Sequence, residues 1–200
     1  MRRATALGHL ATVAAECQRA RDLAHGADFV LRAAYAFGDL LDGAGDMAVV
    51  EIAFVLRLPP GEVTWLADPP DCRYLVHVLR LDKIPVAWYW RPEAWPAGNH
   101  LIRRPVRFWS AEAGIDEQVL RALSRGDAEP LRLPTPPPEQ ERQQLATELA
   151  ASLTHLRATQ DSYWARDWRR EHRGDGSYPE NHLWNAVQGY LELLGTGDTR

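Results

Sequence analysis

Apolar residues in the first 25 positions recur at the spacing of an amphipathic helix. They stand three or four residues apart from residue 4 onward, and charged residues fall toward the opposite side. Gly26 follows at a position that commonly ends a helix. The pattern predicts a helix over residues 4–25 whose buried face carries Leu7, Leu10, Ala14, Cys17 and Ala20.

Four later segments carry patterns typical of strands. Apolar side chains alternate over residues 29–37, which predicts one covered face. Residues 47–58 form an almost continuous apolar run, so we expect a strand that is covered on both faces. Residues 85–92 and 104–110 are two shorter strand candidates, each bounded by proline or small polar residues.

Two acidic residues stand at positions that favour the start of a helix. Asp71 precedes an apolar pattern that includes Leu75, Val78 and Leu79 and is expected to cap a helix there. Asp116 is expected to cap a shorter helix, which Gly126 would close.

The last third of the chain has the longest helical period. A stripe of large side chains runs from Leu145 to Asp167, and Pro179 fits the first turn of a final helix. A short loop between two helices indicates an antiparallel hairpin, which we expect to fold back on the preceding residues to cover its apolar stripe. The inner face of the final helix is predicted to carry Leu183, Trp184, Val187, Tyr190, Leu191 and Leu194.

Together these patterns predict an α+β protein, in which a small mixed sheet with packed helices precedes a C-terminal antiparallel helical hairpin. Residues 129–138 hold five of the fourteen prolines and are expected to be stiff and extended. We therefore divide the chain into an α+β domain at 1–128, a proline-rich linker at 129–138 and the hairpin at 139–200.

Composition and charge exclude some classes of protein. With 23 basic and 27 acidic residues the net charge is −4, which argues against a dedicated binder of duplex DNA. No apolar run approaches the roughly 18 residues of a membrane-spanning helix, and residues 1–22 lack the apolar core of a signal peptide. Cys17 and Cys72 form no CxxC pair and are expected to be buried apolar side chains. We expect a cytoplasmic protein without membrane association.

The segment FGDLLDG at residues 37–43 resembles the FG-S-x-x-x-G turn of minimal nucleotidyltransferases. Gly38 and Gly43 match the two glycines of that motif, and the preceding helix and strand and the following strand, helix and strand match its order of elements. The resemblance implies that the glycines let the backbone approach phosphate. It also implies a D-x-D pair on the next strand that binds two Mg²⁺ ions, with a third carboxylate on the strand after that.

The chain departs from this motif at its chemical positions. Asp39 replaces the serine, and a carboxylate there would repel phosphate. Val49 and Glu51 fall on the D-x-D positions, so Glu51 is the one acid that could bind metal, while Asp46 is expected to point to the opposite face. The candidate residues are therefore Glu51 for catalysis and Gly38, Asp39 and Gly43 for cofactor binding. The alternative is a tight turn that merely needs glycine.

Two segments combine arginine with aromatic residues. In NHLIRRPVRFW, Asn99, His100, Arg103, Arg104 and Arg107 stand near Trp109, and alternation places Arg107 and Trp109 on the face opposite to Val106 and Phe108. Residues 157–173 carry Tyr163, Trp164 and Trp168 among arginines and acids. The first segment could bind RNA, and the alternative is a solvated strand edge. The second could bind RNA or a protein partner, and the alternative is a helix whose aromatic residues pack within the chain.

Histidines offer a further alternative. Glu171, His172, Glu180 and His182 would meet only if the loop before the final helix brings them together, and the alternatives are then a metal site or capping and surface roles.

Over its whole length the chain resembles a bacterial family of unknown function from high-GC Gram-positive organisms, through segments such as RLDKIPVAWYWRP, NHLIRRPVRFWS and YWARDWRREHRG. The missing carboxylates favour a non-catalytic binding or interaction protein on a nucleotidyltransferase-like scaffold, without a cofactor and with a protein partner. The alternatives are a divergent Mg²⁺-dependent nucleotidyltransferase that uses Glu51, and an RNA-binding protein that uses its arginine and tryptophan surfaces.

Overall fold

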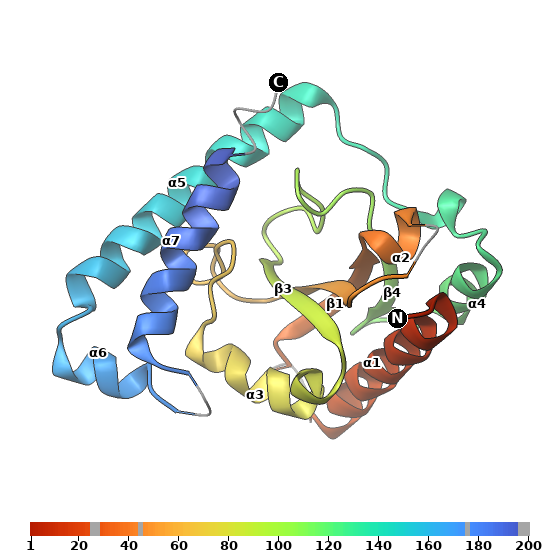
Figure 1. The fold of residues 1–200 in the computed structure, drawn as a ribbon, viewed down its shortest axis with the longest axis horizontal. Helices are drawn as coiled ribbons and strands as arrows, with labels where there is room; N and C mark the ends of the chain where they lie inside the picture. Colours follow the sequence, from red (N-terminus) through yellow and green to blue (C-terminus); the bar gives the residue numbers. More distant parts are fainter. Residues whose placement is uncertain (25–28, 44–45, 175–176, 196–200) are drawn as a thin grey trace.

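The computed structural model describes residues 1–24, 29–43, 46–174 and 177–195 (Figure 1). Its helices are α1 (Arg3–Leu23), α2 (Asp39–Asp42), α3 (Pro70–Val78), α4 (Glu117–Arg125), α5 (Pro138–Ser162), α6 (Arg166–Glu171) and α7 (Pro179–Gly195), with short 3₁₀ turns η1 (Leu81–Lys83) and η2 (Glu129–Leu131). Its strands are β1 (Leu31–Phe37), β2 (Val50–Leu56), β3 (Val86–Pro92), β4 (Val106–Ser110) and β5 (Gly114–Ile115). The predicted α+β class is confirmed.

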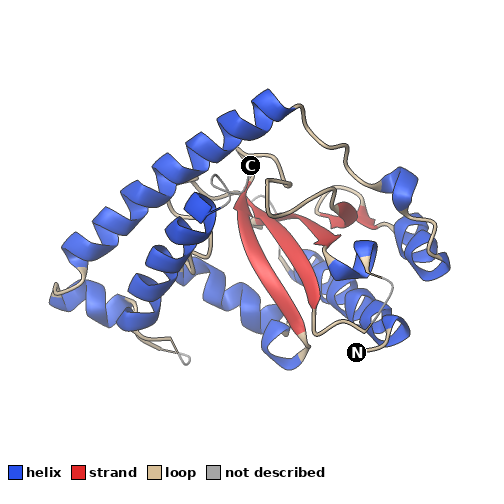
Figure 2. Cartoon of the chain, turned by 45° about the horizontal axis from the view of Figure 1, so that its top comes forward, coloured by secondary structure: helices blue, strands red, loops and turns tan. Residues whose placement is uncertain are grey.

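The five strands form one mixed sheet in the order β3-β2-β1-β4-β5 (Figure 2). β1 pairs antiparallel with β2 and β4, and β5 pairs antiparallel with β4. β2 and β3 are parallel, because α3 and η1 carry the chain back before β3 begins. Because β3 stands at one end of the strand order, it is an edge strand.

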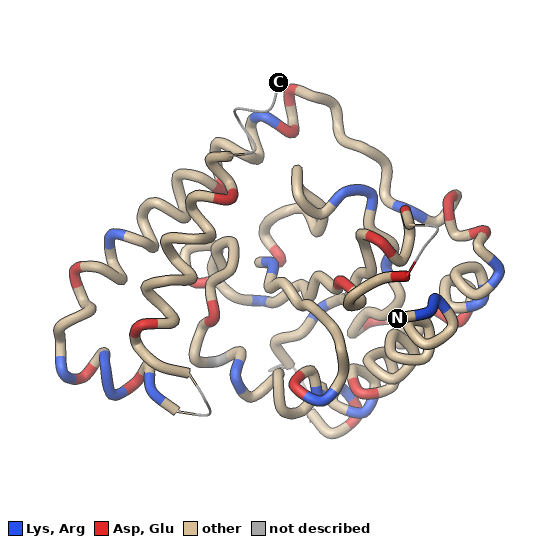
Figure 3. Tube along the Cα trace, viewed as in Figure 1, with Lys and Arg blue, Asp and Glu red and all other residues tan. Residues whose placement is uncertain are grey.

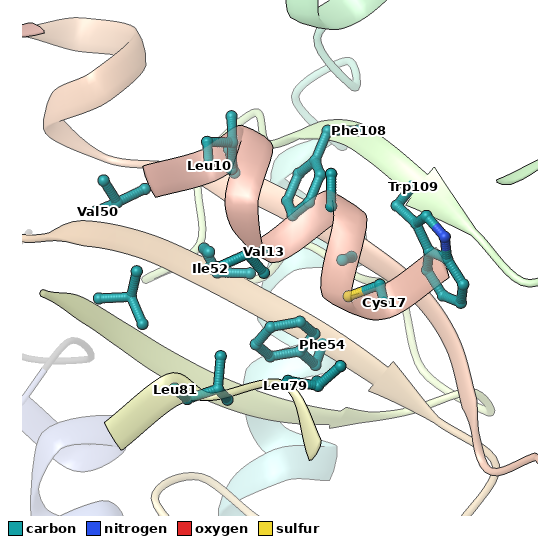
Figure 4. Close-up of a cluster of buried hydrophobic side chains, with 14 of the residues drawn as sticks. Leu10, Val13, Cys17, Val50, Ile52, Phe54, Leu79, Leu81, Phe108 and Trp109 are labelled. Atoms are coloured by element: carbon teal, nitrogen blue, oxygen red, sulfur yellow. The ribbon is translucent and has the colours of Figure 1, made fainter. Parts of the chain in front are cut away.

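One face of the sheet packs on α1 (Figure 4). Leu10, Val13 and Cys17 of α1 meet Ile52 and Phe54 of β2, and all five side chains are fully buried. The predicted helix over residues 4–25 is confirmed over Arg3–Leu23, while Gly26 lies outside the described residues. Both cysteines are buried, as expected.

The opposite face of β2 is also covered, as its continuous apolar run predicted. Ala53 packs there with Phe37, Trp65, Ile102 and Leu193 of α7, and Leu145 and Leu149 of α5 lie against this second cluster. α5 and α7 run antiparallel, as predicted for a hairpin (Figure 1). Because both helices contribute side chains to this second cluster, the hairpin folds back on the sheet. Within the described residues, every helix is too short or too polar to cross a lipid bilayer.

A β-bulge in β4 makes one prediction wrong. Ala34 pairs with Trp109, but the next residue of β1, Tyr35, pairs with Arg107, so Phe108 is an extra residue. The extra residue breaks the alternation of side chains. Trp109 is therefore fully buried together with Phe108, while Arg107 alone is exposed.

The C-terminal helices differ from the sequence prediction in three ways. The stripe expected to continue to Asp167 is interrupted after Ser162, and α6 is a separate helix. The most buried residues of α5 are polar, namely Glu148, Ser152 and Thr159, while its leucines are half-buried. On α7 the buried residues are Pro179, His182, Ala186, Gly189 and Leu193, whereas the predicted inner residues Trp184, Leu191 and Leu194 are exposed.

The reason for the rotated face of α7 is a close backbone contact. A Cβ atom added at Gly189 would lie 2.0 Å from the carbonyl oxygen of Trp65, so α7 packs there through its smallest residues. Helix faces built from Gly and Ala allow such an approach but contribute little apolar signal to a sequence pattern.

Cap predictions gave a mixed outcome. Asp116 accepts a hydrogen bond from the Val119 amide at the start of α4, and Gly126 ends that helix in the left-handed conformation, as predicted. α3 instead begins at Pro70 with Pro69 at the cap position, so Asp71 lies inside the helix.

Candidate functional site

The glycine turn after β1 brings two of the candidate residues together. Gly38 has φ 68° and ψ −145°, a backbone conformation that is open to glycine and strained for other residues. Glu51 lies across from this turn, because Phe37 and Glu51 are paired in the β1–β2 register. A Cβ atom added at Gly38 would stand 1.7 Å from Oε2 of Glu51. Glycine is therefore required at position 38 for two reasons: the backbone conformation there and the space that the Glu51 carboxylate takes up.

The charge state of Glu51 reflects this position. Burial raises the pKa of Glu51, a hydrogen bond from the backbone amide of Asp39 lowers it, and the nearby carboxylates of Asp39 and Asp42 raise it further. The Glu51 carboxylate thus accepts the hydrogen bond of the Asp39 amide at the start of α2, where the resemblance places phosphate. A phosphate approaching this turn would meet the carboxylates of Glu51, Asp39 and Asp42.

The remaining parts of the predicted nucleotide site do not converge on it. Val49 lies just before β2 and is half-buried, Asp46 is exposed, and Gly43 closes α2 by donating its amide to the Asp39 carbonyl at 2.8 Å. In the part of the chain that the structure describes, no group of three His, Cys, Asp or Glu residues is arranged to hold a metal ion. The turn brings acids together without the geometry of a two-metal site.

The arginines of NHLIRRPVRFW are separated from the aromatic residue expected beside them. Trp109 is fully buried, and its indole nitrogen lies 3.3 Å from Oε1 of Gln18. Arg104 forms an ion pair with Glu129 at 2.6 Å. Basic and acidic residues are interspersed along the described part of the trace (Figure 3). Trp109 therefore offers these arginines no stacking surface.

The segment at 157–173 presents one exposed aromatic side chain. Trp164 is 81% exposed and meets Tyr163 edge-to-face at a centroid distance of 4.9 Å. Arg169 lies over both rings and pairs with Glu180 at 2.8 Å. Trp168 instead stacks on His172 at 4.0 Å. The aromatic residues of this segment mainly join α6 to the helices beside it.

The structure does bring His172 and His182 together, with ring centroids 4.7 Å apart, and it adds His155 from α5 to the lining of the same small cavity. Nε2 of His182 lies 3.0 Å from Nη2 of Arg73 and 3.1 Å from Oγ of Ser177. Because arginine can only donate, this nitrogen is an acceptor, and the ring proton belongs on Nδ1.

Burial, with the charges of His172, Arg73 and His155, lowers the pKa of His182 to about 4. A histidine whose free electron pair is already held by Arg73 is a weak base, so the contact with Ser177 does not create a nucleophile. The same occupied nitrogen disfavours the metal site considered for these residues.

A buried ion pair that the sequence patterns did not indicate joins β3 to α5. Nη2 and Nη1 of Arg91 donate to Oε1 and Oε2 of Glu148 at 2.6 and 2.9 Å, and both side chains are 1% exposed. Asn99 and Gln144 each donate to the same carboxylate at 2.8 Å. Arg91 and Glu148 are 57 positions apart, so only the fold reveals the pair. The pair fastens the helical hairpin to the sheet.

A groove runs along the free edge of β3 and has a volume of about 520 Å³. We call it the β3 groove. Its lining residues come from the loop before α3, from α3 and η1, from β3, and from α7 with the loop before it. They are Leu66, Ala67, Asp68, Arg73, Val76, His77, Asp82, Trp88, Tyr89, Trp90, Ser177, Asn181 and Asn185.

Three consecutive residues of β3 locate this groove at the edge. Tyr89 packs on Trp65 on one face of the sheet, whereas Trp90 packs on Phe54 on the other. Successive side chains of a strand point to opposite faces, so a space that touches Trp88, Tyr89 and Trp90 must lie beside the strand.

Comparison with known proteins identifies the family of the chain. Residues 1–199 match the model of a family described as a domain of unknown function (DUF7711), and the chain belongs to that family. No curated protein and no solved structure matches the chain.

Proposed function

We propose that this member of the DUF7711 family is a non-catalytic interaction module, on a nucleotidyltransferase-like scaffold, that binds an extended segment of a partner protein along β3. The observation that carries the proposal is the β3 groove, which touches three consecutive residues of an edge strand. Edge strands that pair with a peptide are a common mode of recognition, in which main-chain hydrogen bonds supply affinity and adjacent pockets supply specificity.

The register of β3 leaves backbone groups for such pairing. Val50 donates its amide to the carbonyl of Pro85 at 3.2 Å, so Pro85 faces β2. In a parallel ladder each residue directs both backbone groups to one side and the next residue directs them to the other. The N–H and C=O groups of Trp88 and Trp90 therefore face the groove.

β3 also lacks the features that protect most edge strands from pairing. Residues 86–90 contain no charged side chain, and the prolines at 85 and 92 limit the pairing length without covering the edge between them. An apolar edge that has no strand paired to it, beside a lined groove, favours a specific partner over a merely solvated strand.

The electrostatics of the β3 groove favour a basic segment. Burial raises the pKa of Asp68, although Arg73 and a hydrogen bond with Trp90 oppose that shift. Arg73 also lies against His182 and donates to the Glu171 carbonyl. Its guanidinium is therefore divided among several acceptors and only partly balances the charge of Asp68. A Lys or Arg side chain of the partner would restore favourable charge around Asp68 and stack on the tryptophans.

Two features support the scaffold and its lack of catalysis. The order α1-β1-α2-β2-α3-β3 follows the order of elements that the resemblance of residues 37–43 predicted. Glu51 lies where the resemblance expects phosphate, which supports the loss of nucleotidyl transfer over the Mg²⁺-dependent alternative. RNA binding is a weaker candidate, because Trp109, the aromatic residue that the sequence pattern grouped with Arg107, is buried.

The test is selection of peptides against the full chain from a phage-displayed random library. We expect selected peptides to carry a basic residue among apolar ones and to lose binding when alternate backbone amides are N-methylated. Asn185→Arg, which fills the β3 groove with a cation, should abolish binding, whereas Gln160→Arg on the exposed side of α5 should not.

Hydrogen exchange gives a second readout on the same complex. The amides of Trp88 and Trp90 should become protected when peptide binds, because they face the groove. Peptides that tolerate N-methylation and bind Asn185→Arg unchanged would disprove the proposal. A thermal shift with ATP and Mg²⁺ that disappears in Glu51→Gln would instead support the enzyme.

A further inference from the structure

We propose that a second cavity, between residues 96–105 and the proline-rich segment, binds a small organic anion with an apolar body. We call it the proline cavity. It has a volume of about 830 Å³, which lies within the range of small-molecule sites, and is larger than the β3 groove. It does not depend on the peptide site, because it lies at the opposite end of α5 from α6 and shares no lining residue with the groove.

The apolar part of the lining is unusually rigid. It consists of Pro96, Pro105, Pro134, Pro136, Pro137, Ile102 and Leu133. Proline has a fixed φ and no amide hydrogen, so this wall is preorganised and offers few backbone donors. An apolar body can therefore be buried against it with little loss of protein entropy on binding.

His100 supplies hydrogen-bonding capacity that the protein does not use. Both ring nitrogens are shielded from solvent, and neither has a hydrogen-bond partner within the described residues. The polar side chains beside it are committed, because Asn99 and Gln144 both donate to Glu148. Buried polar groups normally have partners, so two unsatisfied ring nitrogens next to a cavity favour a molecule bound there.

Arg103 supplies the positive charge. Its Nε donates to the backbone carbonyl of His100 at 3.0 Å, which anchors the guanidinium at the cavity. No ion pair of Arg103 is formed among the described residues, whereas Arg104 is paired with Glu129. The planar guanidinium can take a carboxylate or phosphate through two parallel hydrogen bonds. The ligand must displace any attraction between Arg103 and the carboxylate of Glu141, which also lines the cavity.

The loop that carries Arg103 is held in a strained shape. Arg104 has φ 45°, a left-handed conformation that costs free energy for a residue other than glycine. The side chain of Arg132, which is 6% exposed, donates to the carbonyl of Arg104 at 2.7 Å and to that of Arg103 at 3.4 Å. Such strain persists where surrounding contacts enforce it, and it is concentrated at binding sites.

Two isosteric probes test the proposal, namely 2-naphthoate and its neutral analogue naphthalene-2-carboxamide. Calorimetric titration of the full chain should give saturable binding of naphthoate and about tenfold weaker binding of the carboxamide, because a charge-assisted contact is lost. Arg103→Gln should weaken naphthoate binding by about tenfold and leave carboxamide binding unchanged. Arg170→Gln, an exposed arginine on α6, is the matched control and should change neither affinity.

The ¹⁵N resonances of the His100 ring provide an independent readout, since a ligand that completes its hydrogen bonds must shift them. Equal affinity for the two probes, unchanged naphthoate binding in Arg103→Gln, or no saturable binding of either probe at millimolar concentration would each overturn the proposal.

Discussion

Glu148 offers the most direct test of how the helical hairpin is fastened to the sheet. Burial alone would raise the pKa of Glu148, but hydrogen bonds and charge from Arg91, with further hydrogen bonds from Gln144 and Asn99, hold its pKa below the ordinary value. The carboxylate is therefore ionised and fully hydrogen-bonded inside the protein. Glu148→Gln keeps the shape of the side chain and removes the charge.

The expected loss follows from what remains after the substitution. Arg91 stays charged and 1% exposed without its partner, and removing one member of a buried ion pair costs about 3 to 5 kcal/mol. Because glutamine still accepts hydrogen bonds through one oxygen, we expect the lower end, about 3 kcal/mol. A domain is stable by about 5 to 15 kcal/mol, so this loss is a large fraction of the total.

Equilibrium unfolding in urea, followed by tryptophan fluorescence, measures the effect. The midpoint should fall by about 1 M if the slope is near 3 kcal/mol per M. Glu139→Gln, on the same helix and paired with Arg142 in solvent, is the matched control and should cost less than about 0.5 kcal/mol. The double variant Arg91→Met/Glu148→Leu should recover most of the loss, because no unpaired charge is left buried.

Two results would refute this reasoning. A cost below about 1 kcal/mol for Glu148→Gln would mean that water reaches Arg91, contrary to its burial. Additive losses in the double variant would mean that the two residues act separately rather than as a pair.

The remaining predictions concern the glycine turn and the histidines. Gly38→Ala should destabilise the protein by about 3 kcal/mol in urea unfolding through strain and collision, and Glu51→Ala should relieve part of that loss, whereas purely additive effects would contradict the contact between them. Because the folded protein holds the pKa of His182 near 4, below its ordinary value of 6.5, His182 contributes stability that is complete above pH 6.5 and declines as the pH falls toward 4. His182→Gln should remove about 3 kcal/mol of this decline between pH 7 and 4, and His9→Gln should leave the decline intact. An identical pH profile in His182→Gln would refute that assignment.

The sequence by itself determined the features that depend on neighbouring residues. The alternation in β1, the continuous apolar run of β2 and the helical spacing in α1 are local patterns, and each predicted its element within a few residues. Asp116 and Gly126 predicted the two ends of α4, because capping depends on residues within one helical turn. The covered faces of β2 followed from the same kind of pattern.

The candidate site was predictable only in part. Gly38 and Glu51 were identified from spacing, yet the contact between them is decided by the β1–β2 register, which sets the carboxylate directly over the turn. The β3 groove could not be predicted, because it requires knowing that β3 lies at the edge of the sheet and that α7 stands beside it.

Only the tertiary structure decided the remaining features, and the reason is physical. Arg91 and Glu148 meet because β3 packs beneath α5, and no local pattern links residues 57 positions apart. Trp109 is buried because a bulge adds one residue to β4, and α7 buries Ala186 and Gly189 because its backbone touches Trp65. Hydrophobic periodicity shows which face of a segment will be buried. Close packing and buried charge pairs depend on the particular surface against which that face packs.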